Sequence, residues 1–247
     1  SVDGMQFKRG YKTHYLVTNH AKMESVLDKP YILITDNKIS SLKNLMVLLE
    51  QVHNTQRPLL VISEDGEGEA LQSLVSNHMQ GILKVNLVQA PDYGDTQKDS
   101  LDDIATLTGG KVISESRGMT LESVTIDMLG TCDKVVSTSK DTTIINGHGD
   151  KKELKERIDI LKGHIKNAEK GNAKIMLENR LARLSGGVSV IYVGASSELE
   201  MKEKRDRIED ALGATKAAIE EGIVPGGGVA YIRSIPDLEK LKGLNED

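Results

Sequence analysis

Short apolar runs rich in branched residues alternate with longer segments of helical period between residues 31 and 114. The expected strands are YILIT (31–35), PLLVIS (58–63), ILKVNLV (82–88) and KVIS (111–114). The expected helices between them are SSLKNLMVLLEQV (40–52), GEALQSLVSNHMQG (68–81) and DSLDDIATLTGG (99–110). Strands joined by helical crossovers run parallel, so this alternation predicts an α/β fold with a largely parallel sheet and covering helices.

The second half of the chain carries a different pattern. A strand-rich region extends to about residue 147 and includes KVVST (134–138) and TTIING (142–147). A helical hairpin is predicted from the apolar spacing of Leu154, Ile158, Leu161, Ile165, Leu177, Leu181 and Leu184. We then expect a strand at VSVIYVG (188–194) and a long helix over 198–221 that turns inward Met201, Ile208, Leu212, Thr215 and Ile219.

Composition narrows the classes of partner. A net charge of -5 and a pI near 5.8 argue against nucleic acid, because affinity for nucleic acid is built largely from Lys and Arg. Cys132 is the single cysteine, so no internal disulfide can form, which favours a reducing, cytoplasmic location. No run approaches the ~18 apolar residues of a membrane span. The chain starts at Ser1 without an initiator Met, and we expect it to be a piece of a longer protein.

Two of the predicted helices carry more apolar surface than one sheet face requires. The arc that includes Met46 and Leu49 spans roughly 160 degrees, and the arc with Leu71, Val75 and Met79 spans roughly 180 degrees, against roughly 100 for an ordinary amphipathic helix. Either both helices are buried on two sides, or their excess apolar edges form an open groove for peptides. In an open groove, Leu49→Glu or Val75→Glu should abolish peptide binding and leave stability nearly intact.

Three carboxylates support a rival enzymatic interpretation. Asp36 follows one predicted strand, and Glu64 and Asp65 follow the next, at the sheet edge where α/β proteins bind ligands. Such a set could hold Mg²⁺ for a phosphohydrolase or a nuclease-like enzyme. A purely structural role is a third alternative, which peptide binding would separate from the groove hypothesis. The six histidines show no paired metal spacing, and no metal site is predicted from them.

Several segments, in the same order along the chain, resemble the group I chaperonins, the GroEL type: GMQFKRGY, KISSLKNL, SEDGEGEAL, IATLTGG, LEMKEKRDRIEDALGATKAAIEEGI and GGGVA. The resemblance implies an apical domain with a β/β/α swivelling fold over 3–188. It further implies the descending half of an intermediate domain over 189–220, with its long helix, and the start of an equatorial segment over 221–247. The resemblance thereby implies that the chain is part of a molecular chaperone. The complete protein, which we call the parent, would assist protein folding in an ATP-driven ring.

The resemblance also implies which residues bind non-native polypeptides and the lid co-chaperonin. These are Tyr11, Thr13, Tyr15, Leu16, Met46, Leu49, Leu71, Val75, Ser76 and Asn77. The chain departs from the common family pattern at three positions: Leu16 replaces an aromatic residue, Ser76 an apolar residue and His14 a proline.

Further roles follow from the resemblance alone. Gly227 would lie against the nucleotide, and Asp210 would be the catalytic carboxylate of hydrolysis, only in the complete parent with ATP and Mg²⁺. Arg9 and Glu198 would form an ion pair between neighbouring subunits of a homo-oligomeric ring. Because the phosphate-binding half is not in this sequence, we expect the chain alone to need no cofactor and to be inactive as an ATPase. The resemblance further implies that most ring contacts are equatorial, and nearly all of that domain is absent here, so we expect the chain alone to be mainly monomeric.

Overall fold

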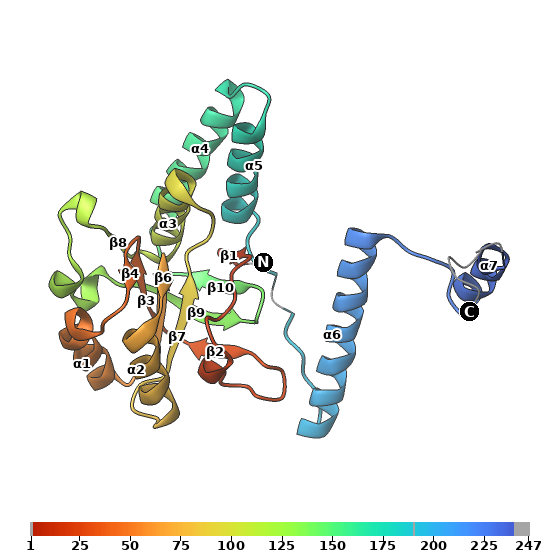
Figure 1. Cartoon of the computed structure of the whole chain (residues 1–247), viewed down its shortest axis with the longest axis horizontal. Helices are drawn as coiled ribbons and strands as arrows, with labels where there is room; N and C mark the ends of the chain where they lie inside the picture. Colours follow the sequence, from red (N-terminus) through yellow and green to blue (C-terminus); the bar gives the residue numbers. More distant parts are fainter. Residues whose placement is uncertain (1, 190, 240–247) are drawn as a thin grey trace, which may run out of the picture. The chain divides into compact units, whose positions relative to one another are not determined.

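The computed structural model describes residues 2–189 and 191–239. The chain divides into two compact units, residues 1–190 and 191–247, and Figure 1 labels their elements. The predicted domain boundaries after residues 188 and 220 stay predictions. Residues 240–247, the end of the predicted equatorial segment, lie outside the described part of the chain.

Eight strands of the described first unit form one mixed sheet with the order β1-β10-β9-β3-β5-β7, in which β2 also pairs with β9 and β8 with β3 (Figure 1). Their bounds are β1 Gly4–Phe7, β2 Ser25–Asp28, β3 Tyr31–Thr35, β5 Leu59–Ser63, β7 Val85–Gln89, β8 Val112–Ile113, β9 Gly130–Ser137 and β10 Thr142–Gly147. A separate parallel pair joins β4 Lys38–Ile39 to β6 Asp65–Gly66. Strands β3, β5, β7 and β8 run parallel, as the alternation predicts, whereas β1, β2, β9 and β10 pair antiparallel.

The helices of this unit follow the predicted order. They are α1 Met46–Thr55, α2 Gly68–Met79, α3 Gly94–Thr108, α4 Lys151–Asn167 and α5 Asn172–Ser185, with the 3-10 turns η1 His14–Leu16, η2 Lys43–Leu45, η3 Glu115–Arg117, η4 Leu121–Ser123 and η5 Ile126–Met128. The Asp150 carboxylate begins α4 by accepting hydrogen bonds from the N–H groups of Lys152 (2.7 Å) and Glu153 (3.1 Å). The predicted hairpin is therefore α4 and α5.

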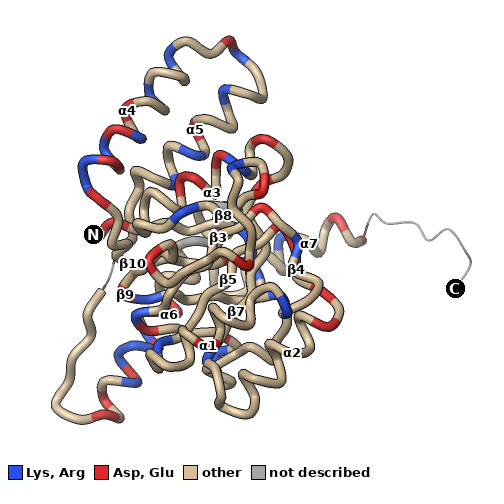
Figure 2. The backbone as a smooth tube through the Cα atoms, turned by 90° about the vertical axis from the view of Figure 1, so that its left-hand side faces the viewer, with Lys and Arg blue, Asp and Glu red and all other residues tan. Residues whose placement is uncertain are grey.

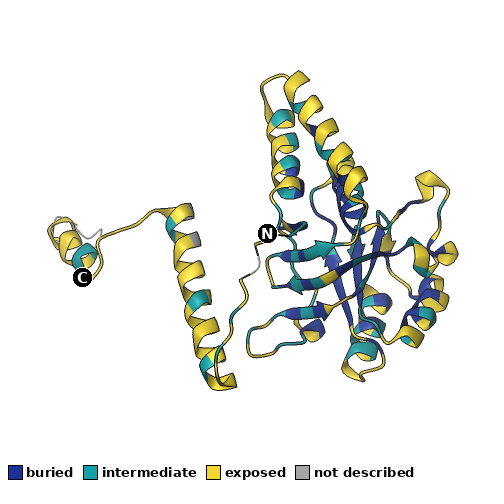
Figure 3. Cartoon of the chain, turned by 180° about the vertical axis from the view of Figure 1, so that it is seen from behind, coloured by how far each residue is buried: buried dark blue, intermediate teal, exposed yellow. Residues whose placement is uncertain are grey.

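The two faces of the sheet bury two separate apolar clusters. Along β3, Ile32 and Ile34 join the cluster under α3, α4 and α5, which we call the hairpin-side core, and Leu33 joins the cluster under α1 and α2, which we call the α1/α2-side core. Successive side chains of a strand point to opposite faces, so one strand supplies both cores. The buried residues concentrate on the strands and on the inner faces of the helices (Figure 3).

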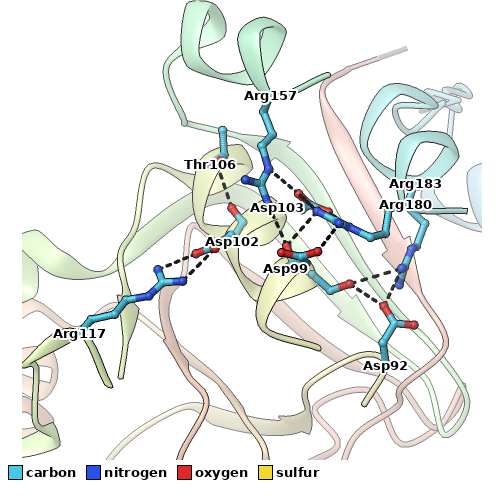
Figure 4. A network of polar contacts seen from close by, with 10 residues as sticks. Asp92, Asp99, Asp102, Asp103, Thr106, Arg117, Arg157, Arg180 and Arg183 are labelled. Atoms are coloured by element: carbon cyan, nitrogen blue, oxygen red, sulfur yellow. Dashed lines mark hydrogen bonds and ion pairs between the residues drawn. The ribbon is translucent and has the colours of Figure 1, made fainter. Parts of the chain in front are cut away.

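A network of carboxylates and guanidinium groups joins α3 to the hairpin and to η3 (Figure 4). Arg180 contacts Asp103 through two hydrogen bonds and Asp99 through a third, at 2.6 Å. Arg157 adds a bond to Asp103 at 2.8 Å, and Arg117 forms a bidentate pair with Asp102. Since the carboxylate in each of these four ion pairs belongs to α3, the network fixes that helix against its neighbours.

The described second unit contains α6 Glu198–Glu221 and α7 Val229–Leu238. The predicted long helix is confirmed, but its expected inward side chains are not buried: Met201, Leu212 and Ile219 are exposed. Charged side chains of both signs lie along α6 (Figure 2), some of them in i,i+4 pairs such as Lys204–Glu200 at 3.1 Å. A helix needs a second apolar surface to bury its stripe, and the described part of this unit supplies none to these side chains.

The strand expected over 188–194 does not form among the described residues. Val188 makes an isolated bridge with Val2, and Tyr192 is exposed without regular structure. A strand requires a neighbour that takes up its backbone hydrogen bonds, and in the part of the chain that the structure describes only Val2 pairs with this segment.

Candidate functional site

The segment after β1 lies along the outer edge of β7. Tyr11 bridges to Val88, and the Lys12 N–H donates to the Leu87 carbonyl at 2.8 Å. The Lys12 ammonium contacts the Asp65 carboxylate at 2.5 Å. Burial raises the pKa of Asp65, but the Lys12 hydrogen bond and a bond from the Gly66 N–H outweigh it and hold that pKa below its ordinary value. These contacts hold the beginning of η1 beside the sheet.

Turn η1 is fixed to the core by one buried side chain. Thr13 precedes the turn, and its hydroxyl accepts a long hydrogen bond from the Tyr15 N–H at 3.5 Å. Leu16 is fully buried in the α1/α2-side core, whereas Tyr15 is 53% exposed. The turn therefore presents Tyr15 outward while Leu16 anchors it.

A hollow of about 610 Å³ lies between η1 and α2. Ala70 and Leu74 turn the other side of α2 into the core, Leu71 and Val75 are half-buried, and Met79 is 67% exposed. None of the side chains around the hollow is charged; they belong to Thr13, Tyr15, Leu71, Gln72, Val75, Ser76, Met79 and Gln80. The excess apolar edge predicted for this helix is open.

Helix α1 does not share in this hollow. Leu49 is only 8% exposed and lies in the α1/α2-side core, while Met46 is 59% exposed at the start of the helix. The segment with Leu121, Val124 and Leu129 packs into the same core, so α1 is buried on two sides. The expectation that Leu49 faces an open cleft with α2 is wrong, because this later segment covers the apolar edge of α1.

The residues named by the family resemblance therefore separate into two groups. Those around the hollow are Thr13, Tyr15, Leu71, Val75 and Ser76; those elsewhere are Tyr11, Leu16, Met46, Leu49 and Asn77. The Asn77 carbonyl accepts the N–H groups of Ile82 and Leu83, which ends α2. Their proposed binding roles stay predictions.

His78 links the walls of the hollow from behind. Its Nδ1 accepts a hydrogen bond from the Val85 N–H at 3.2 Å, and its ring also bonds the backbone of Val17, just after η1. Burial lowers the pKa of His78, with Lys84 and His20 adding positive charge nearby.

Sequence reasoning missed His78, Gln72 and Gln80. Gln72 and Gln80 each lie four residues from Ser76 on the same helix, and this spacing would have placed both glutamines beside Ser76 at the edge of the hollow. The role of His78 depends on contacts with segments distant in sequence.

The proposed subunit contact involves residues of both units. The Arg9 guanidinium stacks 4.7 Å from the centre of the Tyr93 ring, and the Arg9 carbonyl accepts the Thr142 hydroxyl at 2.7 Å. Glu198 is the first residue of α6 and is exposed. A contact between neighbouring subunits lies outside one chain and stays a prediction.

The two residues assigned to nucleotide chemistry lie in the second unit. Asp210 is exposed on α6. Gly227 and Gly228 have φ angles of 66° and 79° in the turn before α7, a region that favours glycine. This geometry shapes a turn, and the ATP-related roles of Asp210 and Gly227 stay predictions.

Two of the three carboxylates of the rival magnesium interpretation have other partners. Asp36 accepts a hydrogen bond from the Ser114 hydroxyl at 2.6 Å, and Asp65 is paired with Lys12. Over residues 2–189 and 191–239, no group of three or more His, Cys, Asp or Glu side chains could hold a metal ion, so Asp36, Glu64 and Asp65 form no such site.

Within the same ranges, no helix combines the length and apolar character that crossing a membrane requires.

The comparison with known families covers the entire chain. Residues 1–247 match the model of the TCP-1/cpn60 chaperonin family, and the mixed α/β fold is consistent with a domain of that family. Such membership implies a chaperone role, with binding of non-native polypeptides and oligomeric assembly in general. The chain therefore belongs to the TCP-1/cpn60 chaperonin family.

Proposed function

We propose that the hollow between η1 and α2 binds exposed apolar segments of non-native polypeptides. The observation that carries this proposal is an uncharged hollow of about 610 Å³ in which Tyr15 and Met79 stay exposed. Exposed apolar side chains gathered in a concave surface are typical of protein-binding sites. Methionine suits varied partners because its unbranched side chain adapts its packing.

The expected affinity is weak. Covering roughly 300 Å² of apolar surface at about 25 cal/mol per Å² gives roughly 7 kcal/mol before the entropy cost of association, which removes much of it. A chaperone needs clients to leave again, and weak binding to many sequences fits that need.

For the parent protein we propose the group I, GroEL-type assignment, on the strength of the sequence resemblance. Residues 3–188 would then form the apical domain, and the lid co-chaperonin would bind the same hollow as the clients. ATP and Mg²⁺ would bind the complete, cytoplasmic ring, with Gly227 beside the nucleotide and Asp210 as the catalytic carboxylate. Arg9 and Glu198 would pair across neighbouring subunits.

The hollow can be tested with two matched substitutions. Val75→Glu places a charge inside the hollow, and a bound apolar segment would have to desolvate it. Val47→Glu makes the same change on α1 at a side chain that is 63% exposed and does not line the hollow. With a fluorescent apolar peptide, anisotropy should show binding lost in the first variant and retained in the second, both with wild-type melting curves. Equal affinity in both variants would contradict the proposal.

A further inference from the structure

A second hollow, of about 540 Å³, lies where α3 ends and α4 begins, and we call it the α3/α4 pocket. Its walls come from the last turns of α3, the first turns of α4, the residues that lead into β8, and the segment from η3 to Met119. None of its described lining residues borders the hollow between η1 and α2. Volumes of about 300–1,000 Å³ are typical of small-molecule sites, so the α3/α4 pocket has the size for such a ligand.

Close packing of the main chain fixes the walls of the α3/α4 pocket. The Gly149 N–H donates to the Leu107 carbonyl near the end of α3 at 2.9 Å. A Cβ atom at position 149 would collide with the Thr106 carbonyl oxygen, so glycine is what lets the chain cross the end of α3 just before α4. Across the pocket, the Lys111 N–H donates to the Met128 carbonyl at 2.9 Å. The pocket is therefore preformed by the fold.

Part of the pocket lining is apolar. Ala105 on α3 is 8% exposed, Val112 on β8 is 4% exposed, and Met119 is half-buried. A ligand that carries an apolar group could cover these three side chains and exclude water from them. Covering a group the size of a leucine side chain raises affinity by about tenfold or more.

Charged side chains of both signs surround this apolar lining. They are the cations Lys111, Arg117 and Arg157 and the carboxylates Asp102 and Glu153. Figure 4 shows the two guanidinium groups, one from η3 and one from α4, contacting carboxylates of α3. Arg117 forms a bidentate pair with Asp102, and Arg157 donates to Asp103 at 2.8 Å. Both guanidinium groups are thus matched by carboxylates of the protein.

Lys111 and Glu153 are the charges that remain. Both are exposed, and over the described residues neither side chain forms a hydrogen bond or an ion pair. Asp127 attracts Lys111 only at longer range. Because Asp102 engages Nη1 and Nη2 of Arg117, the Nε–H of Arg117 also stays open to a ligand. A purely anionic ligand would leave Glu153 unmatched, whereas a ligand with one charge of each sign complements the pocket.

We propose that the α3/α4 pocket binds a small zwitterion with an apolar side chain, the chemistry of a free α-amino acid. The ligand's carboxylate pairs with Lys111 and the Arg117 Nε–H, its ammonium pairs with Glu153, and its side chain covers the apolar lining. This site goes beyond the proposed function, because it binds a metabolite and not a client. A ligand that joins the start of α4 to the segment 111–119 also stabilises the first unit.

Four small ligands test the proposal by calorimetric titration of the chain at pH 7. Leucine carries both charges and an apolar side chain, and glycine carries the charges alone. Leucinamide lacks the carboxylate and imitates the first residue of a polypeptide, while N-acetyl-leucine lacks the ammonium and imitates the last. Loss of either charged contact or of the side chain should weaken binding about tenfold relative to leucine. Leucine should also raise the melting temperature of the wild-type chain.

Two variants assign the charged contacts. Lys111→Met should weaken leucine binding about tenfold and narrow the preference for leucine over leucinamide. Glu153→Gln should weaken it similarly and narrow the preference for leucine over N-acetyl-leucine. The controls Lys152→Met and Glu156→Gln make the same changes on α4 outside the pocket and should bind leucine like wild type. All four side chains are exposed, so melting curves without ligand should match wild type.

Several outcomes would overturn the proposal. Leucinamide or N-acetyl-leucine binding wild type as tightly as leucine would assign the pocket to one end of a polypeptide. Unchanged preferences in both pocket variants would place the leucine site elsewhere, and no leucine binding near its solubility limit would exclude the site altogether. The result is independent of the proposed function, because Val75→Glu alters the other hollow and should leave leucine binding intact.

Discussion

Arg180 on α5 and Asp103 on α3 form a bidentate ion pair within the fold. The Arg180 Nε lies 2.9 Å from Asp103 Oδ2, and Nη2 lies 3.0 Å from Oδ1. Their side chains are only 4% and 3% exposed. Removing Arg180 is costly, because the buried Asp103 carboxylate would lose two hydrogen bonds and keep only the one from Arg157.

Replacing Arg180 by leucine should therefore lower the free energy of unfolding by about 3–5 kcal/mol. Arg117→Leu provides a matched control, since Arg117 and Asp102 form the same bidentate geometry with side chains 42% and 27% exposed. An exposed pair contributes about 0–1 kcal/mol. Urea denaturation of both variants measures the difference, and equal losses would show that burial does not set the strength of the Arg180 pair.

Leu49 and Met46 should respond in opposite ways to a charge. Leu49→Glu buries a carboxylate in the α1/α2-side core and should destabilise the first unit by about 4 kcal/mol or more. Met46→Glu changes a side chain that is already in water and should alter stability by about 0.5 kcal/mol or less. Thermal unfolding of both proteins checks this. A folded Leu49→Glu variant with wild-type stability would show that Leu49 faces an open cleft after all.

The alternation of apolar runs was enough to predict β3, β5, β7 and the helices between them, because a period of two or of 3.6 is a local property. It could not say whether the excess apolar arc of α1 is open. That depends on Leu121, Val124 and Leu129, which reach the helix from more than sixty residues away. The arc of α2 looks alike in sequence, and only the position of η1 leaves a hollow beside it.

The failure at 188–194 has the same origin. Alternating apolar residues favour a strand, but pairing is a property of two segments, and among the described residues Val188 pairs only with Val2. The described part of α6 shows the converse: Leu212 belongs to a correctly predicted helix and still has no core to enter.

Asn86 in the middle of β7 should be a site of easy stabilisation. Its side chain is fully buried, and neither its amide nitrogen nor its amide oxygen has a hydrogen-bond partner among the residues that the structure describes. It lies opposite Leu60, which belongs to the hairpin-side core. A buried unpaired polar group costs about 1–3 kcal/mol, so Asn86→Val should raise the free energy of unfolding by about 1 kcal/mol or more. Asn86→Asp should lower it strongly, and a loss of stability with valine would mean that the amide is satisfied.

His78 should make the stability of the first unit sensitive to mild acid. Burial, with the positive charges of Lys84 and His20, holds the pKa of His78 in the folded chain below its ordinary value of 6.5. Between the lowered pKa and about 6.5 the unfolded chain binds more protons than the folded chain, so stability falls as pH drops through that range. Nδ1 of His78 now accepts a hydrogen bond from the Val85 N–H. Protonation would give Nδ1 its own hydrogen, so that two donors would face each other and this bond would be lost.

The variant His78→Asn isolates this effect, because an amide oxygen can accept from Val85 without titrating. Urea denaturation at pH 7.5 and at pH 5.5 should show a smaller loss of stability in the variant than in wild type, and the difference belongs to His78 rather than to carboxylates or other histidines. Peptide binding should weaken in parallel in wild type, since His78 joins α2 to Val17 and Val85 behind the hollow. Identical pH dependence in both proteins would show that folding does not lower the pKa of His78.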